Sequence, residues 1–247
     1  QPVQEQETRG ERAGHVAQTV DRSRVGVVVG TIFGGDFSTQ LLMGLRLPEF
    51  QQTLERALEK HAVPAGQIRE IRQAYADVFL KHMPALLDET GSFTSSGLAS
   101  RITKAFDLLG GAVAVDAGTA SSAAAVECCV DVLLSGACDM MVCVGAQQDM
   151  GPSTYADRAI TRTLATGQPR CPFDFQADGV VPGEGCGVLL LKRLSDARRD
   201  GDPIQGLIRG IGSAYASSRK HAIRLAAQRA LAAASIPADE VWALETT

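Results

Sequence analysis

The chain has 247 residues, of which 45% are hydrophobic and 21% are charged, and its formal net charge at pH 7 is −4. This composition is typical of a globular protein that is large enough to bury a core. The acidic balance and an aromatic content of only 5% argue against a nucleic-acid partner. No apolar run is long enough to span a membrane, so we expect a cytoplasmic protein without a membrane partner.

The first half of the chain alternates polar, apolar and helical patterns. A polar segment, residues 1–24, precedes a β-branched apolar run at 25–32 that predicts a buried strand. Apolar residues at helical spacing predict two charged outer helices at 49–61 and 65–83. A shorter helix is expected at 98–110, where two glycines end it.

The next three segments predict the centre of the fold. Residues 111–117 and 138–146 are short apolar strands, and residues 120–136 between them form a helix whose first turns hold small side chains. Strand, helix and strand at this spacing are typical of a right-handed crossover in a parallel sheet with both faces covered. We therefore expect an α/β fold.

The last part of the chain predicts a second set of strands. A strong strand is expected at 187–194, a partner strand at 204–216, an amphipathic helix at 219–236 and the opening of a further strand at 241–247. An intact domain rarely ends at the start of a strand. We therefore expect this chain to be a piece of a larger protein.

Cysteine and histidine spacing gives no sign of a metal site. The six cysteines form no C-x-x-C, and the four histidines form no pair at ligand spacing. Cys128 and Cys129 are adjacent on the predicted helix. Cys138 and Cys143 lie five apart on a predicted strand, which would send them to opposite faces. We expect free, mostly buried thiols and no bound metal.

The turn between the first central strand and its helix, in VDAGTASSAA at 115–124, is the candidate site. A residue at a sharp turn before a buried helix is exposed at the carboxyl end of the sheet, where ligands bind in open α/β folds. The positive end of the helix dipole also stabilises a thiolate or an oxyanion there. Thr119 occupies this position. Taken alone, such a turn is also compatible with ordinary packing.

Two long segments carry a resemblance to a known family. Residues 115–139, VDAGTASSAAAVECCVDVLLSGACD, and 171–187, CPFDFQADGVVPGEGCG, resemble the β-ketoacyl synthase motifs V-D-T-A-C-S-S-S and R-P-F-D-x-x-x-D-G-F-V-x-G-E-G-x-G. The resemblance covers 25–247, with a helical insertion at 49–83. It implies a thiolase-like layered α/β/α/β/α fold, normally dimeric and incomplete in this chain. It also implies a structural turn at Phe173, Asp174, Asp178, Gly179, Gly183, Glu184 and Gly185.

Two departures from the family pattern point to a lost activity. Thr119 stands three residues after Asp116, where the family has its nucleophilic cysteine. Aligning Glu245 with the family's E-A-H-G-T-G-T motif puts Thr247 at the first catalytic histidine. The resemblance therefore implies no catalytic residue here, and an acyl-pocket or interface role for Gly118, Thr119, Ala120, Ser121 and Ser122.

Within the family, this pattern is most similar to chain-length-factor domains of polyunsaturated-fatty-acid or polyketide synthases. Such a domain pairs with an active ketosynthase as a hetero- or pseudo-dimer and shapes its acyl tunnel. It binds no cofactor, and the substrates of the complex are phosphopantetheine thioesters on an acyl carrier protein. Two alternatives stay open: a malonyl-thioester decarboxylase or atypical ketosynthase that uses Thr119, and a structural scaffold of a synthase.

Overall fold

The computed structural model describes residues 21–32, 35–83, 94–147, 151–167, 170–171 and 174–244. Within these ranges the elements in chain order are η1 (Arg22–Arg24), β1 (Val25–Gly30), α2 (Gly35–Leu45), α3 (Leu47–Lys60), α4 (Ala65–His82), α5 (Ser95–Phe106), β2 (Ala112–Val115), α6 (Ser121–Leu134), β3 (Met140–Gln147), α7 (Pro152–Ile160), β4 (Gly185–Lys192), α8 (Leu194–Asp200), α9 (Arg219–Ala234) and η3 (Ala238–Glu240).

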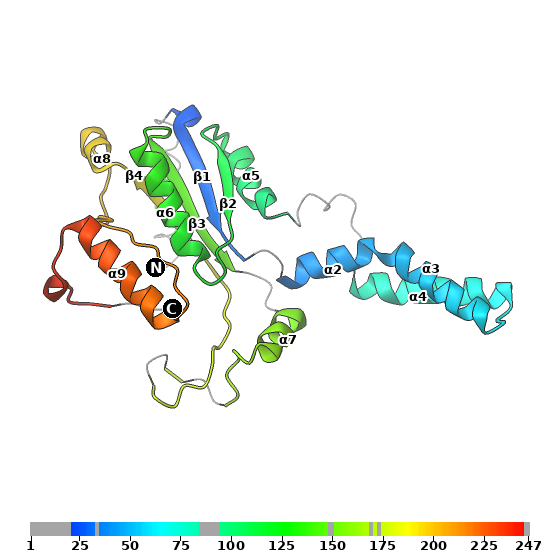
Figure 1. Ribbon diagram of the computed structural model, residues 1–247. Coiled ribbons are helices and arrows are strands. Elements are labelled where there is room, and N and C mark those ends of the chain that lie inside the picture. Colours follow the sequence, from blue (N-terminus) through cyan, green and yellow to red (C-terminus); the bar gives the residue numbers. More distant parts are fainter. Residues whose placement is uncertain are drawn as a thin grey trace, which may run out of the picture.

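A four-stranded sheet in the order β2-β1-β3-β4 forms the body of the described chain (Figure 1). β1 is parallel to both β2 and β3, with Val28 opposite Val113 on one side and Cys143 on the other. β4 is antiparallel to β3, with Leu189 opposite Cys143. The predicted parallel crossover through the helix at 120–136 is therefore confirmed. The strand expected at 187–194 is also confirmed, with both of its ends two residues earlier in the chain.

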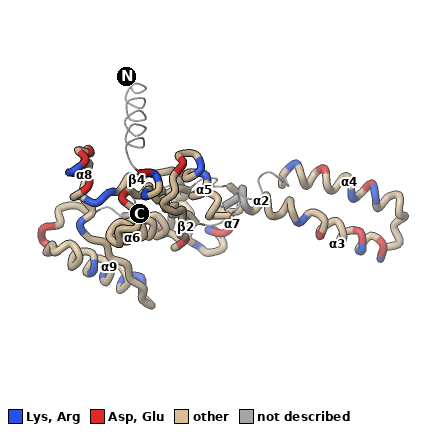
Figure 2. The backbone as a smooth tube through the Cα atoms, turned by 90° about the horizontal axis from the view of Figure 1, so that it is seen from above, with Lys and Arg blue, Asp and Glu red and all other residues tan. Residues whose placement is uncertain are grey.

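The two predicted outer helices form a hairpin, α3 and α4, that extends away from the sheet (Figures 1 and 2). Phe50 of α3 lies against Phe79 of α4 with ring centroids 5.5 Å apart. Arg72 and Glu55 form an ion pair of 3.0 Å between the same two helices. The hairpin is thus held together by contacts of its own, and α2 joins it to the sheet.

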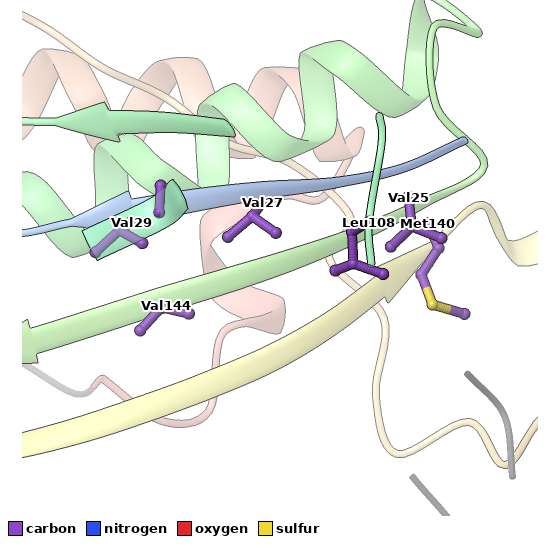
Figure 3. Packing of buried hydrophobic residues seen from close by; sticks show 7 residues of the cluster. Val25, Val27, Val29, Leu108, Met140 and Val144 are labelled. Carbon is purple, nitrogen blue, oxygen red and sulfur yellow. The ribbon is translucent and has the colours of Figure 1, made fainter. Parts of the chain in front are cut away.

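The core lies on the two faces of the sheet because side chains alternate along each strand. On β1, Val27 and Val29 face α5, whereas Val28 faces α6. Figure 3 shows the first face, where β1 and β3 side chains meet Leu108. Burying each of these side chains contributes about 1.5–3 kcal/mol relative to leaving it exposed. β1 is buried along its whole length, which agrees with its uninterrupted apolar sequence.

The cysteine prediction was partly wrong. Cys138 and Cys143 lie in the same buried cluster beneath α6, together with Cys129, rather than on opposite faces. The reason is that β3 begins at Met140, so Cys138 belongs to the preceding loop and does not follow the strand's alternation. All six cysteines are free, and Cys171 and Cys186 are exposed.

The predicted strand at 204–216 is also wrong. This segment has no regular secondary structure and packs along α9 instead. A β-carbon added to Gly210 would lie 2.3 Å from the Ala230 carbonyl oxygen, so the glycines allow a close approach to the helix. A strand also needs a hydrogen-bonded neighbour, and the segment pairs with no strand among the described residues. Residues 241–244 likewise form no strand, and 245–247 lie outside the described residues.

An ion network joins the start of β3 to β1 and to the end of β4. The Asp139 carboxylate accepts hydrogen bonds from Arg24 and from Arg193. Arg193 also donates to the carbonyl oxygens of Leu133 and Cys138, each at 2.8 Å. Hydrogen bonds from Arg24 and then Arg193 hold the pKa of Asp139 well below its usual range. The network therefore requires an ionised carboxylate.

We expect Asp139→Asn to lower the free energy of unfolding at pH 7. Because the carboxylate has a lower pKa in the folded state, its contribution is complete above the unfolded pKa of about 3.9 and is lost as the pH falls through the folded value. The difference between wild type and variant should therefore narrow below about pH 4. Urea unfolding at several pH values measures this.

Asp239→Asn is the control, since Asp239 is exposed and has no ion pair in the described part of the chain. Its effect on unfolding should be small at every pH. Parallel pH profiles for wild type and Asp139→Asn would contradict the assignment of Asp139.

Candidate functional site

A pocket lies at the carboxyl ends of the three parallel strands. Ligands bind at the carboxyl ends of the strands in open α/β folds. β1 ends at Gly30, β2 at Val115 and β3 at Gln147. The cavity has a volume of about 340 Å³, and its walls are Gly30, Thr31, Ile32, Gly118, Thr119, Ser121, Ser122, Gly145, Ala146, Gln147, Gly183, Glu184 and Gly185.

The turn that carries Thr119 is held by short-range hydrogen bonds. Gly118 has a φ of +59°, a left-handed conformation that glycine adopts without strain. Its amide donates to the Asp116 carboxylate at 3.0 Å. The buried Ser121 hydroxyl accepts from the Ala117 amide at 2.9 Å and donates to the Gly118 carbonyl at 2.6 Å. These bonds fix the backbone on both sides of Thr119.

Two glycines let the first turn of α6 lie directly on the strands. A β-carbon added to Gly30 would lie 2.4 Å from the Ser121 carbonyl oxygen, and one added to Gly145 would lie 2.6 Å from the Ser122 hydroxyl oxygen. Gly30 and Gly145 are opposite each other in the pairing of β1 with β3. The helix start and the turn before it are therefore set at a fixed height above the sheet.

Thr119 is exposed and lines the pocket just before the amino end of α6. Its hydroxyl needs a general base to act as a nucleophile, because an aliphatic hydroxyl is not ionised near neutral pH. Among the described residues that line the pocket, Glu184 is the one with an ionisable side chain. The arrangement presents small side chains and hydroxyls to a ligand, with one carboxylate.

The cysteines of α6 do not replace Thr119. Cys129 is fully buried beneath the helix and belongs to the core cluster rather than to the pocket. A hydrogen bond with Cys143, together with burial, raises the pKa of the Cys129 thiol far above its usual range. Burial raises the pKa of Cys128 as well. Protonated thiols are poor nucleophiles, so neither cysteine is activated.

The second family-like segment, residues 171–187, contributes residues both to turns outside the pocket and to the pocket wall. Asp174, Asp178 and Gly179 form turns away from the pocket. The Asp174 carboxylate accepts from the Gln176 amide at 2.9 Å, and Asp178 accepts from the Thr166 amide at 3.1 Å. By contrast, the stretch 183–185 lines the same pocket as Thr119. The expected structural role of 183–185 thus extends to the pocket wall.

The structure brings together four of the five residues expected at the acyl pocket. Gly118, Thr119, Ser121 and Ser122 line it, whereas Ala120 is the N-cap of α6 and is not part of the wall. Phe173 and Thr247 lie outside the described residues. The sequence prediction missed the carboxyl ends of β1 and β3, namely Gly30, Thr31, Ile32, Gly145, Ala146 and Gln147.

Similarity to known sequences assigns this chain to a protein family. The family model described as "Beta-ketoacyl synthase, N-terminal domain" matches residues 10–197. The chain belongs to the β-ketoacyl synthase family. The matched residues include the turn that carries Thr119.

The chain spans only a small part of the length of the curated relatives that it matches. It is 34% identical over 206 residues to a polyunsaturated fatty acid synthase polypeptide of a Thraustochytrium species, which covers 81% of this chain and 7% of the relative. It is also 34% identical over 177 residues to 6-methylsalicylic acid synthase of Aspergillus niger, covering 68% of this chain and 10% of the relative.

Solved ketosynthases share the fold. An oxazolomycin ketosynthase domain of Streptomyces albus JA3453 superposes with a TM-score of 0.65 at 23% identity, over 88% of this chain and 33% of that chain. A β-ketoacyl synthase from Burkholderia phymatum gives 0.63 at 20% identity, over 90% of this chain and 49% of that chain. The expected thiolase-like α/β fold is confirmed. The described sheet and its helices correspond to part of that layered structure.

The part of the chain that the structure describes holds neither a candidate metal site nor a candidate membrane span. No group of three or more potential metal-ligating side chains comes together there. No helix among those residues is long and apolar enough to cross a bilayer.

Proposed function

We propose that this chain is a catalytically degenerate ketosynthase-like partner, a chain length factor, in a fatty-acid or polyketide synthase. It would pair with an active ketosynthase and shape the tunnel that receives the growing acyl chain. The substrates of that complex would be thioesters on the phosphopantetheine arm of an acyl carrier protein.

The single observation that carries this proposal is the presence of Thr119 at the nucleophile turn. The turn is intact: it keeps the left-handed Gly118, the Ser121 hydrogen bonds and the close seating of α6. A thiol there would be partly ionised near neutral pH and further activated by the helix terminus, whereas the threonine hydroxyl is not. This geometry supports the proposal that the scaffold of the active site is retained while threonine replaces the cysteine of the family motif.

One observation favours a second candidate. Glu184 lines the same pocket as Thr119 and supplies a carboxylate. A carboxylate beside a hydroxyl can act as general base, which would allow an atypical ketosynthase that is acylated on Thr119. A protein that only decarboxylates malonyl thioesters would instead use the Thr119 hydroxyl as a hydrogen-bond donor to the enolate.

We expect the wild-type protein to gain no acyl mass when it is incubated with an acyl carrier protein thioester. Thr119→Cys should gain one acyl group, because it restores a thiol at the amino end of α6 in an open pocket. Intact-protein mass spectrometry measures both.

Thr119→Val is the matched control for this experiment, since it keeps the shape of the side chain and removes the hydroxyl. Acylation of wild type that Thr119→Val abolishes would overturn the proposal and establish the atypical ketosynthase. Release of carbon dioxide from a malonyl thioester by the isolated wild-type protein, without acylation, would establish the decarboxylase.

A further inference from the structure

The core between α6 and the sheet is rich in sulfur. Cys129, Cys138, Met141 and Cys143 belong to one buried cluster, and none of these four side chains is more than 3% exposed. A buried thiol packs like a small apolar side chain, so burial by itself gives these cysteines no chemical role. Their pairwise contacts are more informative, because two adjacent thiols can react together.

Cys129 and Cys143 meet across the interface between helix and sheet. Cys129 lies on the buried side of α6, one turn after Ala125 and one turn before Leu133. Cys143 lies on β3 opposite Val28 of β1, and both residues belong to the cluster beneath the helix. The Cys129 thiol donates a hydrogen bond to the Cys143 sulfur, so the two sulfurs are neighbours.

The nearby thiols are placed differently. Cys138 belongs to the loop before β3, and its thiol donates to the Gly110 carbonyl oxygen at 3.3 Å. Cys128 is the residue before Cys129, so it lies on another side of the helix and is only half-buried. No group of three or more potential metal ligands comes together in the described ranges. The cluster therefore presents a pair of thiols rather than a metal site.

The two thiols of the pair differ in character. The hydrogen bond from Cys129 lowers the pKa of Cys143, whereas the same bond and burial raise the pKa of Cys129. The sulfur that ionises more readily attacks an oxidant first, and a neighbouring thiol then completes a disulfide. Because both sulfurs are buried, the oxidant that reaches them has to be small, such as hydrogen peroxide.

We propose that Cys129 and Cys143 are a peroxide-reactive dithiol that closes to a disulfide between α6 and β3. The Cys143 sulfur attacks one peroxide oxygen: the S–O bond forms, the O–O bond breaks, and the departing hydroxide takes the thiol proton and leaves as water. The Cys129 sulfur then attacks the resulting sulfenic acid. The S–S bond forms, the S–O bond breaks, and a second water leaves with the Cys129 proton. The two sulfurs together lose two electrons, which the peroxide gains.

The disulfide would tie together two elements that form the candidate pocket. Cys143 lies two residues before Gly145, on which the first turn of α6 rests at Ser122. Gly145 and Ser122 both line the pocket. Oxidation at this site would therefore join strand and helix covalently beside the pocket. The inference does not depend on the proposed function, because it involves neither Thr119 nor an acyl group.

The test uses the full chain with Cys171→Ser and Cys186→Ser, which remove the two exposed thiols. After treatment of the reduced, folded protein with hydrogen peroxide, we expect intact-protein mass spectrometry to show a loss of about 2 Da that dithiothreitol reverses. Non-reducing digestion after Asp and Glu separates the cysteines onto residues 128–131, 132–139 and 140–149. The expected cross-link joins 128–131 to 140–149.

Single substitutions in the same background assign the two roles. Cys129→Ala should stop the reaction at the Cys143 sulfenic acid, which dimedone labels, and Cys143→Ala should abolish both the label and the cross-link. Cys138→Ala is the matched control, since it removes another buried thiol of the cluster, and Cys128→Ala removes the adjacent thiol. Both should leave the cross-link unchanged.

Three results would overturn the proposal. They are a cross-link that involves residues 132–139, a cross-link that Cys128→Ala abolishes, and a mass loss that appears only after the protein is unfolded in urea.

Discussion

Thr119→Trp is expected to shorten the acyl products of the assembled synthase. Thr119 is exposed and lines a pocket of about 340 Å³. An indole at this position would occupy space that, in the proposed function, receives the acyl chain. The turn is fixed on both sides by hydrogen bonds, so the new side chain cannot easily be displaced by backbone movement. Mass analysis of products from the complex with the active ketosynthase measures the shift.

Thr53→Trp is the matched control, because Thr53 lies on the exposed surface of α3, in the hairpin. It should leave the product distribution unchanged. Products of normal length from Thr119→Trp, with normal total yield, would show that the pocket does not take part in chain-length control.

Gly30→Val is expected to destabilise the protein by at least about 3 kcal/mol, the upper part of the range for overpacking a core. The nearest atoms to an added β-carbon are backbone atoms of Ser121 and Ser122, at 2.4 to 2.9 Å, so no side-chain rotation relieves the clash. Either α6 or β1 must move. Denaturant unfolding, followed by circular dichroism, measures the loss.

The same substitution at Gly187 tests whether the effect is local. Gly187 also lies in a strand, β4, but nothing stands within 4 Å of an added β-carbon there. Gly187→Val should therefore change stability by less than about 1 kcal/mol. If the two variants were equally stable, the close seating of α6 on Gly30 would not hold.

Periodicity alone predicts the centre of this fold well. The strand at 25–32, the helix at 120–136 and the strand at 138–146 are observed with their ends shifted by at most two residues. These segments are long, uniformly apolar or regularly patterned, and bounded by glycines, so local propensity and burial favour the same structure.

The sequence predicts the pocket only in part, because its walls come from segments that are distant along the chain. Thr119 was identifiable from the turn before α6, but Gln147 and Glu184 come from the end of one strand and from the turn before another. Which strand ends are neighbours depends on the sheet order, which local patterns do not encode. The carboxyl ends of the predicted parallel strands were the available signal.

The failure of the strand prediction at 204–216 has a related cause. The segment has the apolar residues of a strand, and Leu207 and Ile208 remain about half exposed. Strand formation depends on a neighbour that supplies hydrogen bonds, and that dependence is not visible in the residues of one segment.

The α3–α4 hairpin is a suitable place for an engineered insertion that does not disturb the pocket. The 18 residues of α4 form a rod about 27 Å long, held to α3 by its own aromatic and ionic contacts. The connection at 61–64 joins the ends of these helices away from the sheet (Figure 1). A fluorophore or an affinity tag inserted there would report on the position of the domain without touching the pocket or the sheet.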